Sequence, residues 1–317
     1  MIFDTASMYF RSFYGLPSSM RSPQGEPVNA VRGLLDAIAR LVEQYSPDAL
    51  ACAWDNDWRP AWRVELLPSY KTHRVAGGAA EADRVGVVGA GALAATGGLA
   101  EESPEGLAHQ VLVIREVLAA LGIAVVGRDG YEADDVIGSL ASQHDGESLV
   151  VTGDRDLFQL ADEHTRIIYI GKGVAKHDLV DPAWVQAKYA VPANRYVDFA
   201  VLRGDPSDGL PGVKGIGDKS AGQLVASHGD LEGMLAAAGD PESTMSPSVR
   251  AKLAGAVDYL AAAREVVRVV PDLPLPELAD GSLTIRPERI DRTALAALDQ
   301  RWGLGGSLER ILTALAG

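Results

Sequence analysis

The chain has almost no cysteine: Cys52 is the only one among 317 residues. A single cysteine cannot form an internal disulfide, and it cannot supply the several thiolates of a multi-cysteine zinc site. The six histidines form no H-E-x-x-H or H-x-x-x-H pair, and no G-x-S-x-G motif is present. These absences argue against a zinc hydrolase and against a serine hydrolase with a nucleophile elbow.

Long apolar segments are also absent. No apolar run approaches the roughly 20 residues that a membrane span requires. The first ten residues, MIFDTASMYF, carry an acid at position 4 and lack the basic and then apolar pattern of a signal peptide. Hydrophobic residues make up 47% and charged residues 23%, as in ordinary globular proteins. We therefore expect a cytoplasmic protein that does not bind membranes.

A surplus of basic residues is missing too, because the formal net charge is −14. Proteins that bind nucleic acids usually show a basic balance, so this value argues at first against such a partner. A metal-dependent enzyme that acts on phosphodiesters must, however, carry clustered carboxylates. The positions of the individual charges are therefore more informative than their sum.

Residues 130–156 combine two acidic ends with an amphipathic helix and a short apolar strand between them. Carboxylates placed this way would repel one another unless a cation lay among them, and a divalent metal cluster would supply one. The alternative is that the acids complement the dipole of a helix N-terminus. The acids of this stretch are Glu132, Asp134, Asp135, Asp154 and Asp156.

Three apolar runs end in aspartates. The first run ends at Asp4, the run 49–54 is followed by Asp55, and the run 149–152 is followed by Gly153 and Asp154. Continuous apolar runs are typical of parallel strands that are covered on both faces. Ligands bind at the carboxyl ends of such strands, so these aspartates should meet in one crevice. The pattern favours an α/β fold and the metal hypothesis.

Residues 58–74 alternate basic and aromatic side chains, among them Arg63, Tyr70, Lys71 and Arg74. Such a mixture suits a single strand of nucleic acid, whose phosphates pair with cations while its bases stack. The alternative is a solvated helix whose tryptophans belong to the core. Residues 75–99 are dominated by Ala and Gly without helical or strand periodicity, and we expect a mobile excursion there.

A further pair of acids, Asp205 and Asp208, precedes a glycine-rich turn at residues 212–217. The turn is not a nucleotide-binding P-loop, because Asp218 stands where that motif requires lysine. It fits a hairpin between two helices, whose backbone N–H groups can bind phosphate without reading bases. Lys214 and Lys219 flank this hairpin.

These motifs occur in an order that resembles bacterial 5′-nucleases, or flap endonucleases, including the 5′-nuclease domain of bacterial DNA polymerase I. The resemblance covers almost the whole chain. Its residues are Asp4 with Arg11, Asp55, the arch motif from Trp62 to Arg74, G-Y-E-A-D-D at 130–135, T-G-D-x-D at 152–156, G-D-x-S-D-x-x-P-G at 204–212 and G-V-x-G-I-G-x-K-x-A at 212–221.

The resemblance implies a PIN-like, mostly parallel central sheet flanked by helices. Residues 1–180 would form the nuclease core, with a helical arch at about 58–108 that includes the insert at about 75–99. Residues 181–317 would form a helical DNA-binding region with a helix–three-turn–helix at about 203–232. The insert is longer than the usual arch segment, and no polymerase domain follows, so we expect a stand-alone nuclease.

The resemblance also implies hydrolysis of DNA phosphodiesters at 5′ flaps, nicks or 5′ ends with two Mg²⁺ or Mn²⁺ ions, and a K⁺ ion at the helix–three-turn–helix. Asp4, Asp55, Glu132, Asp134 and Asp154 would surround the first divalent site, and Asp135, Asp156, Asp205 and Asp208 the second. Catalytic cations would be Arg11, Lys71 and Arg74. DNA would contact Arg63, Tyr70, Lys214, Gly215, Gly217 and Lys219.

Two alternatives stay open at this point. The chain could be a module that holds flaps or forks without cutting them, although all nine expected acids are present. It could also be a related ribonuclease with the same core fold. A comparison of DNA and RNA flap substrates separates these hypotheses.

Overall fold

The computed structural model describes residues 1–75 and 104–316. The predicted insert and the central part of the predicted arch, residues 76–103, lie outside the described residues. Within the part that is described, no helix is both long enough and apolar enough to span a membrane.

A six-stranded sheet with the order β3-β2-β1-β4-β5-β6 forms the centre of the described structure. Strands β1 to β5 are parallel, and β6 pairs with β5 in the antiparallel direction. This arrangement confirms the predicted mostly parallel sheet. The strands are β1 Ile2–Asp4, β2 Ala51–Trp54, β3 Ala124–Gly127, β4 Ser148–Thr152, β5 Thr165–Tyr169 and β6 Asp178–Val180.

Alternate residues of the central strands enter two separate apolar cores. Phe3 and Val151 belong to one core, while their neighbours Ile2 and Val150 belong to the other. This follows from strand geometry, since successive side chains point to opposite faces. Because both faces are buried, the strands read as continuous apolar runs.

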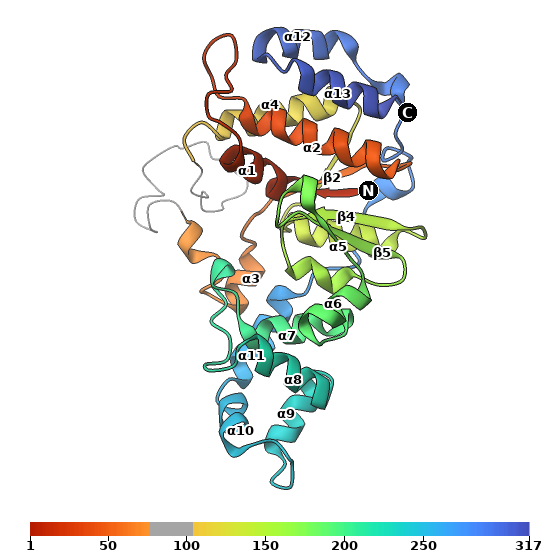
Figure 1. Ribbon diagram of the computed structural model, residues 1–317. Helices are drawn as coiled ribbons and strands as arrows, with labels where there is room; N and C mark the ends of the chain where they lie inside the picture. Colours follow the sequence, from red (N-terminus) through yellow and green to blue (C-terminus); the bar gives the residue numbers. More distant parts are fainter. Residues whose placement is uncertain (76–103, 317) are drawn as a thin grey trace.

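The first core lies against helices from both ends of the chain (Figure 1). The last two helices were predicted to belong to the C-terminal DNA-binding region, but Leu308 and Ile311 are buried in this core, and the two helices pack beside α2 and α4. The apolar stripe of α13 is thus covered by the N-terminal half of the chain. The helices here are α1 Thr5–Gly15, α2 Asn29–Tyr45, α4 Ala108–Ala120, α12 Arg292–Trp302 and α13 Gly306–Leu315.

The second core lies between the opposite face of the sheet and the remaining helices, which extend below the sheet in Figure 1. These helices are α3 Ala61–Leu66, α5 Ala133–Gln143, α6 Pro182–Tyr189, α7 Tyr196–Arg203, α8 Asp218–His228, α9 Leu231–Gly239, α10 Pro247–Ala254 and α11 Val257–Val267. Short 3₁₀ turns are η1 Thr72–Arg74, η2 Asp156–Leu160, η3 Val174–Lys176, η4 Ala193–Arg195, η5 Pro206–Asp208, η6 Pro276–Leu278 and η7 Pro287–Arg289.

Candidate active site

The carboxyl ends of β1, β2 and β4 hold the first acids of the site. Asp4 ends β1, and its Oδ1 accepts a hydrogen bond from the backbone N–H of Ser7 at 3.1 Å, so that it caps α1. Asp55 follows β2 and accepts from the N–H of Ala133 at 2.8 Å. Both carboxylates are therefore oriented by helix N-termini, which favour negative charge.

Thr152 is a residue of the site to which the sequence reasoning gave no role. Its hydroxyl donates to Asp4 Oδ2 at 2.7 Å and accepts from the N–H of Asp154 at 2.9 Å. It thus links the ends of β1 and β4. The sequence contained a signal for this role, because Thr152 is the first residue of the T-G-D-x-D motif.

A cavity of about 880 Å³ opens at this edge of the sheet. All five acids predicted for the first metal site line it, and so do the three predicted catalytic cations. The residues in question are Asp4, Asp55, Glu132, Asp134 and Asp154, together with Arg11, Lys71 and Arg74.

Three of these acids hold their protons unusually strongly. Burial raises the pKa of Asp55 to about 7, although Lys71 and the Ala133 N–H act in the opposite direction. Burial and the negative charge of Asp208 raise the pKa of Asp154 to about 6. Burial and the charges of Asp154 and Asp4 raise the pKa of Asp134. The cavity therefore concentrates negative charge that its own cations do not fully compensate.

Glu132 differs from its neighbours because it is surrounded by donors. Burial alone would raise its pKa, but the charges of Lys71 and Arg63 and the hydrogen bonds from Lys71 and Tyr70 hold the pKa below its usual value. Lys71 Nζ forms an ion pair with Oε1, while Oε2 accepts from Arg63 at 2.5 Å and from the Tyr70 hydroxyl at 2.7 Å. Glu132 is thus a fixed carboxylate at the wall of the cavity.

Three acids predicted for the second metal site are not among the described lining residues of the cavity, namely Asp156, Asp205 and Asp208. Burial and the charges of Asp154, Asp208 and Asp205 raise the pKa of Asp156, so these groups share one electrostatic environment. One carboxylate oxygen of Asp156 is buried without a hydrogen-bond partner among the described residues. Buried polar atoms usually have a partner, so this oxygen is available to a ligand.

The base of the predicted arch is held against the segment that carries Asp205 and Asp208. Lys71 N–H donates to the carbonyl of Asp208 at 3.0 Å, and Ser69 Oγ donates to the carbonyl of Gly209 at 2.8 Å. Gly209 has φ +73°, and a Cβ there would lie 2.0 Å from the Ser69 carbonyl oxygen. Arg74 adds an ion pair to Asp208 at 2.7 Å.

The structure places three predicted residues differently from the prediction. Arg63 and Tyr70 were expected to contact DNA, but they are only 2% and 4% exposed, and both donate to Glu132. Asp135, expected at the second metal site, is fully buried and forms an ion pair with Arg63. The sequence pattern alone could not separate these residues from their exposed neighbours, because it does not show which way a side chain points.

Four residues predicted to contact DNA lie at the turn between α7 and α8 and at the start of α8. None of them is among the described lining residues of the cavity. Lys214, Gly215, Gly217 and Lys219 are exposed, and Gly215 has φ +77°. Gly217 is the N-cap of α8, and its N–H donates to Ser220 Oγ at 3.1 Å. This turn presents positive side chains and a helix N-terminus to solvent.

The cavity residues fit a divalent cation by donor type and charge. The donors are carboxylates, which Mg²⁺ and Mn²⁺ prefer, and their raised pKa values show repulsion that a cation would relieve. Within residues 1–75 and 104–316, no three acid, histidine or cysteine side chains are already arranged as a metal-binding group. The cavity residues therefore fit a divalent cation by the type and charge of their donor atoms, and not by a coordination shell that is already formed.

Comparison with known proteins matches this chain to one family. Residues 1–190 match the model of the 5′-3′ exonuclease N-terminal resolvase-like domain, and residues 191–290 match the model of the 5′-3′ exonuclease C-terminal SAM fold. The chain belongs to the 5′-3′ exonuclease family and is a nuclease, a hydrolase of nucleic-acid phosphodiesters. This membership gives no support to a module that binds without cutting.

Individual relatives agree with this assignment. A 5′-3′ exonuclease of Streptomyces coelicolor is 52% identical, over 99% of both chains. A 5′-3′ exonuclease of Mycobacterium tuberculosis is 45% identical, over 99% of this chain and 97% of the relative. A structure of the bacteriophage T5 flap endonuclease in complex with DNA and metal ions shares the fold, with a TM-score of 0.60 and 16% identity over 98% of both chains.

Proposed function

We propose that the chain cuts DNA phosphodiesters close to the 5′ end of flaps, nicks and gaps, with two Mg²⁺ or Mn²⁺ ions. The observation that carries this proposal is the cavity at the carboxyl ends of β1, β2 and β4, where the five acids predicted for the first metal site and the three predicted catalytic cations line one space. The T5 flap endonuclease with DNA and metal ions has the same fold. The carboxylates of this cavity would hold the divalent ions, whose positive charge would favour the ionisation of water and stabilise the negative charge that develops during phosphodiester hydrolysis.

The acids divide between two groups of ligands. The lining carboxylates would hold the first ion, namely Asp4, Asp55, Glu132, Asp134 and Asp154. Asp156, Asp205 and Asp208 would hold the second, since the unpartnered oxygen of Asp156 lies near their charges. Asp55 and Asp4 are fixed by hydrogen bonds from backbone and Thr152, and this preorganises their oxygen atoms.

The cavity cations would neutralise the phosphate that is cut. Lys71 and Arg74 lie at the arch side of the cavity, where their charges can stabilise the transition state. Arg11 is exposed on α1 and donates to the carbonyls of Gly153 and Gly171, so its guanidinium is directed along the cavity. These groups bind charge and do not read bases.

The turn between α7 and α8 would hold duplex DNA at a distance from the cut. The exposed Lys214 and Lys219 would pair with phosphates, and the turn at Gly215 and Gly217 would lie against the DNA backbone, with a K⁺ ion bound at the turn. Phosphate contacts of this kind position DNA without sequence preference. The enzyme would therefore recognise the structure of its substrate rather than its sequence.

A cleavage assay tests this proposal directly. Purified protein with Mg²⁺ or Mn²⁺ should release short products from DNA that carries a 5′ flap, a nick or a gap, and chelation by EDTA should stop the reaction. A matched RNA flap separates deoxyribonuclease from ribonuclease activity. Intact flap, nicked and gapped DNA in both metals would refute the proposal.

Divalent metal should stabilise the protein in a pH-dependent way. The raised pKa values of Asp55 and Asp154, about 7 and about 6, mean that these groups favour the folded state only while they are protonated. Their contribution to stability is complete below their ordinary pKa near 3.8 and is lost as pH rises through 6 to 7. Metal needs the ionised carboxylates, so its stabilisation should grow across the same window.

Calorimetry with and without Mg²⁺ measures this effect. The rise in Tm caused by Mg²⁺ should be small at about pH 5 and several degrees larger at about pH 8. In Asp55→Asn the rise at the higher pH should shrink. An equal rise at both pH values would show that the cavity carboxylates do not bind the ion.

A further inference from the structure

We propose that Arg63 is a positioning residue that fixes Glu132 at the wall of the cavity, and that Asp135 is the counter-ion of Arg63 rather than a ligand of the second metal ion. The inference rests on the proposed function, because it concerns the wall of the same metal site. It assigns separate roles to the acids of the G-Y-E-A-D-D motif, all of which were predicted from the sequence to be metal ligands.

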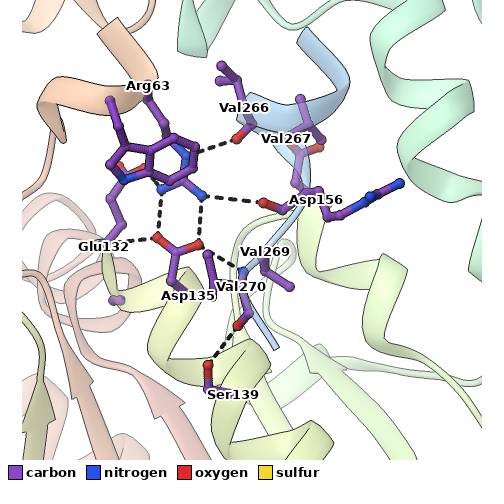
Figure 2. A network of polar contacts seen from close by, with 12 residues as sticks. Arg63, Glu132, Asp135, Ser139, Asp156, Val266, Val267, Val269 and Val270 are labelled. Atoms are coloured by element: carbon purple, nitrogen blue, oxygen red, sulfur yellow. Dashed lines mark hydrogen bonds and ion pairs between the residues drawn. The ribbon is translucent and has the colours of Figure 1, made fainter. Parts of the chain in front are cut away.

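The guanidinium of Arg63 is buried between three segments that are distant in the sequence. Its Nη1 donates to Glu132 Oε2 at 2.5 Å and to Asp135 Oδ2 at 2.7 Å, and its Nη2 donates to Asp135 Oδ1 at 2.7 Å. Its Nε donates to the carbonyl oxygen of Val266 at 2.9 Å. Figure 2 shows Arg63 on the orange segment, the acids on the α5 segment and Val266 on the blue segment.

Asp135 has its hydrogen-bonding capacity occupied away from the cavity. Both of its oxygens accept from Arg63, Oδ1 also accepts from the N–H of Val270 at 3.1 Å, and Oδ2 from the N–H of Glu132 at 3.2 Å. Its side chain is fully buried, and it is not among the cavity-lining residues that include Glu132 and Asp134. A residue turns about 100° along a helix, so Asp134 and Asp135 at the start of α5 face different directions.

Arg63 determines which oxygen of Glu132 faces the cavity. Oε2 is held on the buried side by Arg63 and by the hydroxyl of Tyr70. Oε1 forms an ion pair with Lys71, which lines the cavity. Without the guanidinium, the carboxylate would lose one of its buried partners and could rotate.

The same contacts join the start of α5 to the segment that follows α11. Val270 bonds to Asp135 through its N–H, and its carbonyl oxygen accepts from Ser139 Oγ at 2.7 Å. A Cβ on Gly138 would lie 2.5 Å from a Val269 methyl carbon, so this segment packs directly against α5. Arg63 therefore connects the arch base, the acidic helix and the C-terminal helices through one buried charge.

Binding of Mn²⁺ and thermal unfolding together separate positioning from simple structural support. Arg63→Met leaves Asp135 buried and unpaired, so the variant should unfold at a lower temperature. The double variant Arg63→Met/Asp135→Asn removes both charges and keeps an amide that can cap α5, so it should recover most of the lost Tm. In both variants the Kd for Mn²⁺, measured by electron paramagnetic resonance, should be about 10-fold higher than in the wild type.

Single substitutions in α5 test the role of Asp135. Asp135→Asn alone should bind Mn²⁺ within about threefold of the wild type, whereas Asp134→Asn should weaken binding at least 10-fold. Arg63→Lys keeps the charge but loses the two-point contact with Asp135, and it should recover only part of the Mn²⁺ affinity.

Three results would overturn the proposal. Wild-type Mn²⁺ affinity in the double variant would make Arg63 a structural residue only. Failure of the double variant to regain Tm would show that Asp135 is not the counter-ion of Arg63. Equal losses in Asp135→Asn and Asp134→Asn would make Asp135 a metal ligand. A wild-type chain that binds Mn²⁺ but cuts no flap would refute the proposed function and leave these comparisons valid, whereas absence of Mn²⁺ binding would refute both.

Discussion

Replacement of Asp154 by Asn should lower the rate of flap cleavage on the order of 10³-fold. Asp154 follows β4 at the carboxyl edge of the sheet and lines the cavity with Asp4 and Asp134. Its charge repels those neighbours, so the substitution removes the charge of a proposed metal ligand. Asparagine keeps an oxygen that can accept the hydrogen bond that the Asp156 N–H donates to Asp154 Oδ1 at 2.8 Å. We therefore expect unchanged or slightly higher stability and nearly unchanged affinity for flap DNA.

The comparison requires a matched aspartate outside the site. Asp145 is exposed at the end of the α5 segment, and Asp145→Asn should cut at the wild-type rate. Single-turnover cleavage gives the rate, a gel-shift titration in Ca²⁺ gives the affinity, and calorimetry gives Tm. A loss of DNA affinity as large as the loss of rate would show that Asp154 binds substrate instead of supporting the chemical step.

Replacement of Lys71 by Ala should slow cleavage by about 10²-fold, mainly through kcat. Lys71 lines the cavity, and its ammonium forms an ion pair with Glu132. Burial would lower the pKa of Lys71, but the negative charge of Glu132 and its other neighbours keeps the pKa well above the usual value, so the group stays charged. If the cavity is the cleavage site proposed above, its loss removes positive charge from the place where the transition state forms.

The fold should tolerate this substitution, because Glu132 keeps hydrogen bonds from Arg63 and Tyr70. Lys176 is an exposed lysine outside the cavity, and Lys176→Ala serves as the control that removes one charge from the surface. Metal affinity of Lys71→Ala should remain measurable and close to that of the wild type. An unchanged cleavage rate would exclude Lys71 from the mechanism.

The ends of the strands were predictable because three apolar runs each lead into an aspartate. In a parallel sheet those ends share one edge, and the structure places Asp4, Asp55 and Asp154 around one cavity there. The ordered motifs added Glu132, Asp134, Lys71 and Arg74 to the same space. Local sequence was sufficient for these residues because each stands next to the strand or helix end that orients it.

Residues that act across the structure were not predictable in the same way. Arg63 stands among basic and aromatic residues in the sequence, which suggested a nucleic-acid contact, yet it is buried against Asp135 and the carbonyl oxygen of Val266. The helices α12 and α13 follow the predicted DNA-binding helices in the chain, but α13 packs on α2 and α12 on α4. In both cases the partner lies far away in the sequence.

The sequence by itself determined the parallel strands that end in acids and the family of this nuclease, since these depend on residue type and short spacing. Only the tertiary structure decided which charges face the cavity and which are neutralised inside the protein. The physical reason is that an unpaired charge is costly when it is buried. A buried acid is therefore paired with a cation that the packing of distant segments places beside it. Asp134 and Asp135 are neighbours in the sequence, but only Asp134 is left to line the cavity.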